Sequence, residues 1–63
     1  MNRRELLRKL RHVGCVLLRS GGNHDIYVNP KTGKKQPVPR HSEIDEHLVE
    51  HILRYLGVEH EQS

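Results

Sequence analysis

The chain has 63 residues, 33% of them hydrophobic, with a formal net charge of +3 and one cysteine. A domain of this length buries only about 60% of its unfolded surface, which excludes a deep enclosed cleft, so any chemistry must take place on an open surface. The lone cysteine excludes an internal disulfide, and no apolar run is long enough for a signal peptide or a membrane span. We therefore expect one cytoplasmic domain over residues 1–63, with no membrane partner.

The first expected element is an amphipathic helix over residues 2–14, with Asn2 as its N-cap and Gly14 as the residue that ends it. Its apolar residues recur at helical spacing and form one stripe, made of Leu6, Leu7, Leu10 and Val13. The opposite face carries Arg4, Arg8 and Arg11. Two alternatives explain these arginines: contact with a polyanionic partner, or solubility alone.

Three short strands are expected next, at residues 15–19, 24–29 and 35–39. The first, CVLLR, has enough consecutive apolar residues to be covered on at least one face. The glycines of SGGN permit a tight turn between the first two strands. The third contains Pro37 and Pro39, which cannot donate hydrogen bonds to a neighbouring strand, so it should lie at or near an edge of the sheet.

The second strand, HDIYVN, alternates. Ile26 and Val28 should therefore share one face, and Tyr27 and Asn29 the other. Strict alternation places His24 on the face of Ile26 and Val28. That apolar pair is expected to face the core, so His24 escapes burial only if it lies beyond the covered part of the sheet.

A second helix is expected from Glu46 to Leu56, with Asp45 as its cap and Gly57 at its end. Its buried stripe consists of Leu48, Val49, Ile52, Leu53 and Leu56. Because each helix has one apolar stripe, both most simply pack on the same face of the sheet. The predicted fold is α+β, in the order α-β-β-β-α, with a three-stranded antiparallel sheet and a frayed tail at residues 59–63.

Basic residues are concentrated in the first two-thirds of the chain, where residues 1–40 hold ten of the eleven lysines and arginines. A polyanionic partner, RNA or DNA, is the physical interpretation, with an ordinary solvated surface as the alternative. Candidates on or beside the sheet and its turns are Arg19, Lys31, Lys34, Lys35 and Arg40. The chain has no aromatic pair of the kind that stacks bases, so phosphate and shape recognition are favoured over base reading.

His24 is the leading candidate for chemistry, because it stands between a glycine turn and a strand. An imidazole held there exchanges a proton near neutral pH, which suits general acid–base catalysis. The alternative is a partly packed turn histidine without function. His41, just past the third strand, and His12 are lesser candidates, and a satisfied loop histidine is the simpler interpretation of His41.

Two other features of the sequence are candidates for a metal site and for a reactive thiol. HLVEH, at residues 47–51, matches the H-x-x-E-H pattern of inverted zinc peptidases. However, His47 and His51 should lie on the polar side of their helix with no evident third ligand, so a solvated helix face is favoured and no metal is expected. Cys15, bordered by apolar residues in a strand, should be inert.

The segment GCVLLRSGGNHDIYVNP, followed by VPRHSEI and a helix that ends RYLGV, resembles the HicA (YcfA-like) toxins of toxin–antitoxin systems, over roughly residues 2–58. The most specific part is an arginine, a two-residue spacer and Gly-x-His, which is Arg19, then Gly22, Asn23 and His24. The family usually has Gly-Ser-His at this point. The resemblance implies a fold like that of double-stranded RNA-binding domains, a catalytic role for His24, and neutralisation by a partner antitoxin, HicB.

The resemblance also implies an RNA-cleaving toxin that stops translation. The mechanism expected for it is metal-independent cleavage of mRNA, with His24 transferring protons and nearby cations stabilising charge at phosphorus, without a cofactor. The partners would be RNA and an acidic antitoxin. The rival hypothesis is an RNA-binding module of the same fold that lacks catalysis.

Overall fold

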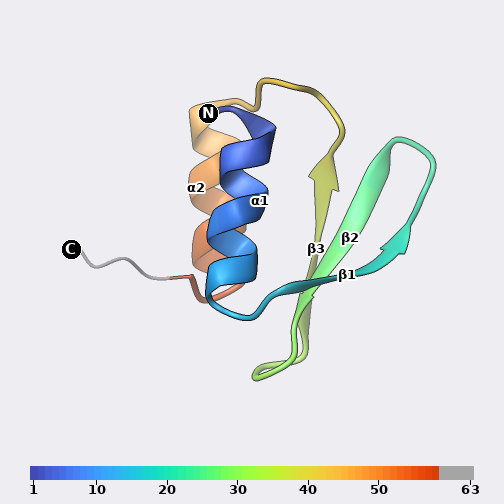
Figure 1. Ribbon diagram of the computed structural model, residues 1–63, viewed down its shortest axis with the longest axis vertical. Coiled ribbons are helices and arrows are strands. Elements are labelled where there is room, and N and C mark those ends of the chain that lie inside the picture. Colours follow the sequence, from blue (N-terminus) through green and yellow to red (C-terminus); the bar gives the residue numbers. More distant parts are fainter. Residues whose placement is uncertain (59–63) are drawn as a thin grey trace.

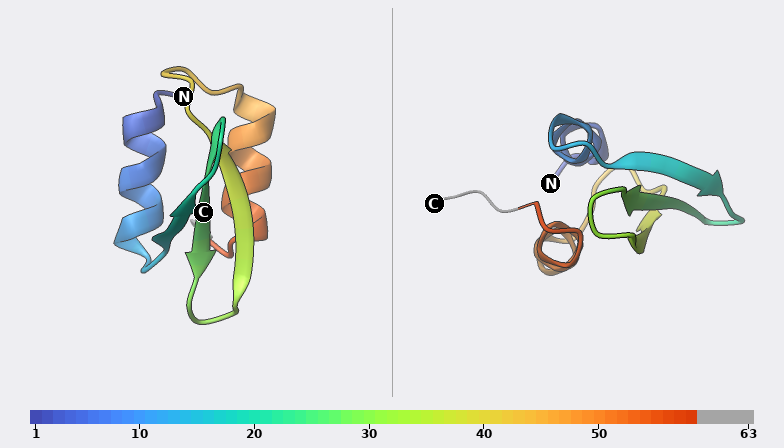
Figure 2. Two further views of the ribbon diagram at one scale, coloured as in Figure 1. Left: turned by 90° about the vertical axis from the view of Figure 1, so that its right-hand side faces the viewer. Right: turned by 90° about the horizontal axis from the view of Figure 1, so that it is seen from below.

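The computed structural model describes residues 1–58. Its elements are α1 (Arg3–His12), β1 (Val16–Ser20), β2 (His24–Asn29), β3 (Lys34–Pro39) and α2 (Glu46–Tyr55). The strands form one antiparallel sheet in the order β1-β2-β3, and both helices lie on one side of it (Figures 1 and 2). The predicted α+β order is confirmed. The predicted frayed tail, residues 59–63, lies outside the described residues.

Both helices begin and end where their capping residues predict. The side chain of Asn2 accepts a hydrogen bond from the backbone N–H of Arg4 at 2.8 Å. Gly14 follows α1 with a φ of 99°, a conformation that a residue with a Cβ rarely adopts. The Asp45 carboxylate accepts from the backbone N–H groups of His47 and Leu48 at the start of α2. Neither helix of the described chain is long and apolar enough to cross a membrane.

The core lies between the helices and the central part of the sheet. Its fully buried side chains are Leu6, Leu10, Cys15, Val38, Ile52 and Leu56. Tyr27 joins them at 6% exposure, whereas Tyr55 is 42% exposed at the end of α2. The thinness of this layer follows from a short chain without phenylalanine or tryptophan.

The face of β2 that packs against the helices carries Tyr27 and Asn29, both buried. Ile26 and Val28 point to the opposite, uncovered side and are only partly buried. The alternation was predicted, but the expectation that the apolar pair faces the core was wrong. Asn29 can be buried there because its Nδ2 donates to the backbone carbonyl of Leu56 at 2.6 Å. This bond gives a partner both to the buried side-chain amide and to a carbonyl at the end of α2.

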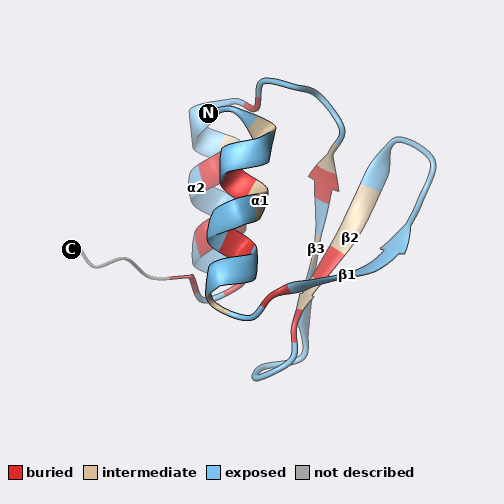
Figure 3. Cartoon of the chain, in the orientation of Figure 1, coloured by how far each residue is buried: buried red, intermediate tan, exposed pale blue. Residues whose placement is uncertain are grey.

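β1 is exposed along its whole length, which corrects the prediction that one of its faces is covered. Val16, Leu17 and Leu18 are 48%, 49% and 48% exposed. β1 leads away from the helices, and the two short helices do not extend over it (Figures 1 and 3). Cys15, immediately before β1, is the point at which this segment leaves the core.

An irregularity in the pairing of β1 with β2 decides which way Arg19 points. Leu17 pairs with Tyr27 and Arg19 pairs with Ile26, so Leu18 is an extra residue with no partner on β2. Without this bulge, Leu17 and Arg19 would share a face. With it, Arg19 lies on the uncovered side of the sheet, on the same face as Ile26.

Candidate functional site

His24 is exposed as the first residue of β2, at the end of the glycine turn. The backbone N–H of Gly21 donates to the carbonyl of His24 at 2.7 Å, which closes the turn. Side chains alternate along β2, so His24 shares the uncovered face with Ile26. Its exposure therefore follows from the side of the sheet on which it lies, and not from a position beyond the covered part as the sequence had suggested.

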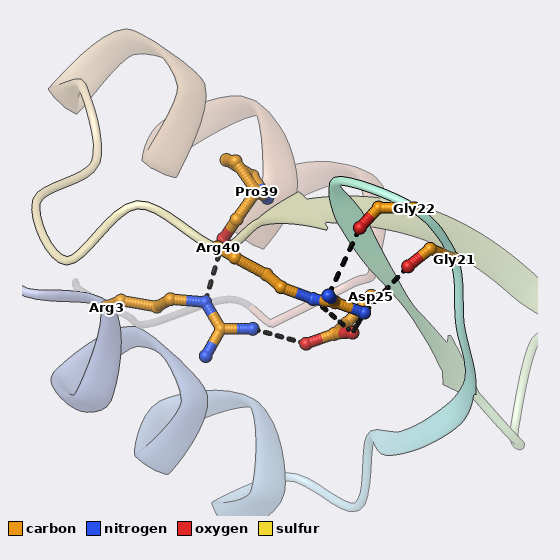
Figure 4. Close-up of polar contacts among 6 residues, drawn as sticks. All are labelled: Arg3, Gly21, Gly22, Asp25, Pro39 and Arg40. Carbon is orange, nitrogen blue, oxygen red and sulfur yellow. Dashed lines mark hydrogen bonds and ion pairs between the residues drawn. The ribbon is translucent and has the colours of Figure 1, made fainter.

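The turn that presents His24 is held by the side chain of Arg40, which follows β3. The Arg40 guanidinium donates to the carbonyl of Gly22 at 3.1 Å and to that of Gly21 at 2.7 Å (Figure 4). Its Nε donates to Oδ1 of Asp25 at 3.0 Å. One arginine thus ties both glycines of the turn to the residue after His24.

Asp25 connects this turn to α1. Its other oxygen, Oδ2, accepts from Arg3 at 2.6 Å, and the Nε of Arg3 donates to the carbonyl of Pro39 at 2.7 Å (Figure 4). The Asp25 side chain is only 15% exposed. Its hydrogen bond from Arg40, with further contributions from Ser20 and Arg3, holds the pKa of Asp25 below its usual value, although desolvation opposes the shift. We call Arg3, Asp25 and Arg40 the carboxylate clamp.

The carboxylate clamp is the part of the site that sequence reasoning missed. Arg40, which was predicted to bind RNA, has its guanidinium bonded within the protein and its side chain 44% exposed. Arg3 and Asp25 were not singled out. The partners of Asp25 are 22 and 15 positions away, so no local sequence pattern connects them.

A surface hollow lies over the turn and is lined by Gly22, Asn23, His24, Arg40 and His41. A second hollow, beside β3 and the start of α2, also has His24 and His41 in its lining, together with Pro37 and Pro39. The structure therefore brings His41 next to the leading candidate His24. His12 is exposed at the end of α1 and lines neither hollow.

The other basic residues near the sheet separate into two groups. Arg19, opposite Ile26, and Lys35, opposite Val28, share the uncovered face with His24. Lys34 is opposite Asn29 on the helix side, where its Nζ lies 5.2 Å from the ring centroid of Tyr55. Lys31 is exposed in the turn between β2 and β3.

The three arginines of the predicted basic helix face, Arg4, Arg8 and Arg11, are exposed on α1. α1 lies on one side of the sheet (Figure 2), and the alternation of side chains along β2 places His24 on the other side. These arginines therefore belong to a different surface from the one that carries Arg19, His24 and Lys35.

The histidines of the HLVEH motif lie on the exposed side of α2. The ring of His51 stacks on Tyr55, with 5.9 Å between centroids and 13° between planes. Within residues 1–58, the structure contains no group of three or more His, Cys, Asp or Glu side chains that could hold a metal ion. The Tyr55 ring contacts both His51 and Lys34, and this accounts for the one exposed aromatic side chain.

Cys15 is fully buried. Burial raises the pKa of its thiol, which keeps it protonated and suppresses its nucleophilicity. Cys15 was predicted to lie within the first strand, but the residue lies immediately before β1.

Residues 3–58 match the family model described as HicA toxin of bacterial toxin-antitoxin. No curated protein and no solved structure matched the chain. The matched range includes both helices, all three strands and the turn that carries His24.

Proposed function

The chain belongs to the HicA toxin family of bacterial toxin–antitoxin systems, and on this premise we propose that it is an endoribonuclease that cleaves mRNA and so inhibits translation. The observation that carries the proposal is the exposed imidazole of His24 on a turn held by the carboxylate clamp. A fixed backbone with an outward-facing imidazole is what proton transfer to a large, open substrate requires.

RNA carries its own nucleophile, which simplifies the task of the protein. In the proposed reaction His24 accepts the proton of a ribose 2′-hydroxyl, and the 2′-oxygen attacks the adjacent phosphorus. The bond from phosphorus to the 5′-oxygen breaks and the departing oxygen takes up a proton from a general acid or from water, leaving a 2′,3′-cyclic phosphate and a 5′-hydroxyl. One positioned acid–base group contributes about 10²–10⁴ in rate. No metal and no cofactor is needed to generate the nucleophile in this scheme.

Two cations on the face of His24 support RNA as the substrate. Arg19 and Lys35 share that face, so a strand that passes over His24 also meets their charges. Contacts of this kind position the phosphate backbone and stabilise charge that develops at phosphorus.

The HicA toxin family implies an antitoxin partner. We propose that the partner is a HicB-like protein with an acidic surface, that it covers His24 with Arg19 and Lys35, and that the pair acts in the cytoplasm. Complementary charge would speed its association with this basic face.

Replacement of His24 tests the proposed function. We expect His24→Ala to lower RNA cleavage by about 10²–10⁴-fold and to relieve growth arrest, because the proton acceptor is lost. The measurements are growth on induced expression and cleavage of RNA by purified protein in the presence of a chelator. His47→Ala, an exposed histidine on α2, is the matched control and should retain full activity.

The rival RNA-binding module makes the opposite prediction. If His24→Ala changes neither RNA affinity nor any measured activity, the nuclease proposal fails and binding alone remains. A strict requirement for added magnesium would defeat the metal-independent mechanism while leaving the assignment of a nuclease intact.

A further inference from the structure

His41 lies near His24, where the end of β3 meets the glycine turn. The two side chains line the same hollow over the glycine turn and also the adjoining hollow beside β3. Both residues are exposed. The hydrogen bonds of this corner, over residues 1–58, engage Arg3, Asp25 and Arg40 but neither imidazole. Both rings are therefore available to a substrate.

The backbone of His41 is fixed on both sides, although the residue lies in a loop. Before it, Arg40 is bonded to Asp25 and to the glycine turn. After it, the carbonyl of Ser42 accepts from the backbone N–H of Arg3 at 2.9 Å. Ile44 follows, buried at 3% exposure.

The strand register places the two histidines within reach of one phosphodiester. His24 pairs with Pro39 across β2 and β3, and His41 is two residues beyond Pro39. Paired Cα atoms lie about 5 Å apart and two residues extend the chain by at most about 7 Å, so the two Cα atoms are no more than about 12 Å apart. Side chains that line one hollow from this separation can contact opposite sides of a bound phosphate.

We propose that His41 is a second catalytic residue, which donates a proton to the leaving 5′-oxygen while His24 accepts the proton of the 2′-hydroxyl. The proposal rests on the nuclease function proposed above. In the step, the bond from the 2′-oxygen to phosphorus forms and the bond from phosphorus to the 5′-oxygen breaks. One proton moves to His24 and one leaves His41, so charge and atoms balance, and exchange with water restores both imidazoles.

An oligoribonucleotide with sulfur in place of the 5′-bridging oxygen separates the two roles. The cleavage site is first mapped on ordinary RNA with the unaltered protein, and sulfur is then placed at that position. A thiolate departs without protonation, so a general acid is no longer needed, whereas the 2′-hydroxyl must still lose its proton. Each variant is assayed on both the oxygen and the sulfur substrate.

We expect His41→Ala to lower cleavage of the oxygen substrate by about 10²–10⁴-fold and to leave cleavage of the sulfur substrate near that of the unaltered protein. His24→Ala should lower both. His47→Ala, the matched exposed histidine, should lower neither. His41→Asn, which keeps a polar side chain of similar size, should behave as His41→Ala, and thermal unfolding of each variant verifies that it is folded.

Three outcomes would overturn the assignment. Unchanged cleavage of the oxygen substrate by His41→Ala means that His41 takes no part. Equal losses on both substrates mean that His41 acts through structure or binding and not as the acid. Failure of the unaltered protein to cleave either substrate removes the nuclease function itself, and with it the role of His41, whereas the first two outcomes leave the nuclease function standing.

Discussion

His24 and Asp25, adjacent at the start of β2, point to opposite sides of the sheet. His24 faces solvent on the uncovered side of the sheet, and Asp25 points to the helix side, where Arg3 and Arg40 hold it. This division follows from the two-residue period of a strand. His24 could be singled out from sequence because glycines and a strand pattern surround it. The role of Asp25 could not, since its partners come from the start of α1 and from the loop after β3.

The carboxylate clamp predicts a loss of stability in acid. The folded pKa of Asp25 lies below its ordinary value of 3.8, because Arg40 and Arg3 bond the ionised form. The unfolded chain therefore takes up the proton at a higher pH than the folded one, so the stabilisation is complete above about pH 4 and is lost as pH falls through the folded pKa. Thermal unfolding from neutral pH down to about pH 2 measures this loss.

Asp25→Asn isolates the contribution of this carboxylate from that of the other acids. The variant should unfold at a lower temperature than the unaltered protein at neutral pH, and the difference should shrink as the pH falls below about 4. A difference that stays constant down to that range would show that the charge of Asp25 contributes nothing.

Among the elements, the helices could be predicted closely and the strands less so. Caps and apolar stripes are local signals, and those of α1 and α2 were confirmed, except that Leu48 is only partly buried. Alternation in β2 assigns two faces but does not tell which of them the helices cover. The covered face is the one that carries Asn29, a polar residue that is buried because it donates a hydrogen bond to the end of α2. That contact spans 27 positions, so no local pattern reveals it.

Asn29 should therefore contribute strongly to stability. Its Nδ2 donates to Leu56 and its Oδ1 accepts from the backbone N–H of Lys31, so truncation leaves buried polar groups without partners. We expect Asn29→Ala to lower the free energy of unfolding by about 1–3 kcal/mol, measured by chemical denaturation. Asn23→Ala, at an exposed position in the turn, is the control and should change it by less than about 0.5 kcal/mol. Equal effects of the two variants would contradict this role.

At the scale of the whole molecule, a two-layer order with both helices on one side could be predicted, because each helix has a single apolar stripe. The distribution of charge between the two sides could not. The bulge at Leu18 turns Arg19 to the side of His24, and the register of β3 sends Lys35 there and Lys34 to the helix side. Both depend on strand pairing, which composition and local spacing do not reveal.

This distribution predicts which lysines and arginines set the salt dependence of RNA binding. In a His24→Ala background, in which we expect cleavage to be slow, Arg19→Gln and Lys35→Gln should each reduce the slope of log affinity against log salt by about 0.7. Lys34→Gln, one position from Lys35 but on the Tyr55 side, should leave the slope unchanged. Fluorescence anisotropy of a labelled single strand over a range of salt concentrations gives the slopes. An equal reduction by Lys34→Gln would mean that RNA also contacts the helix side.

If the protein is the nuclease proposed above, the uncovered side of the sheet leaves His24 open to RNA within the part of the chain that the structure describes. Over residues 1–58 both helices are committed to the far side, so none of these elements screens His24 from a passing strand. On that proposal, restraint comes from the antitoxin partner that the family implies. The number of active copies in a cell would equal the excess of this chain over its inhibitor, and a small change in the synthesis or turnover of either one would produce a sharp threshold.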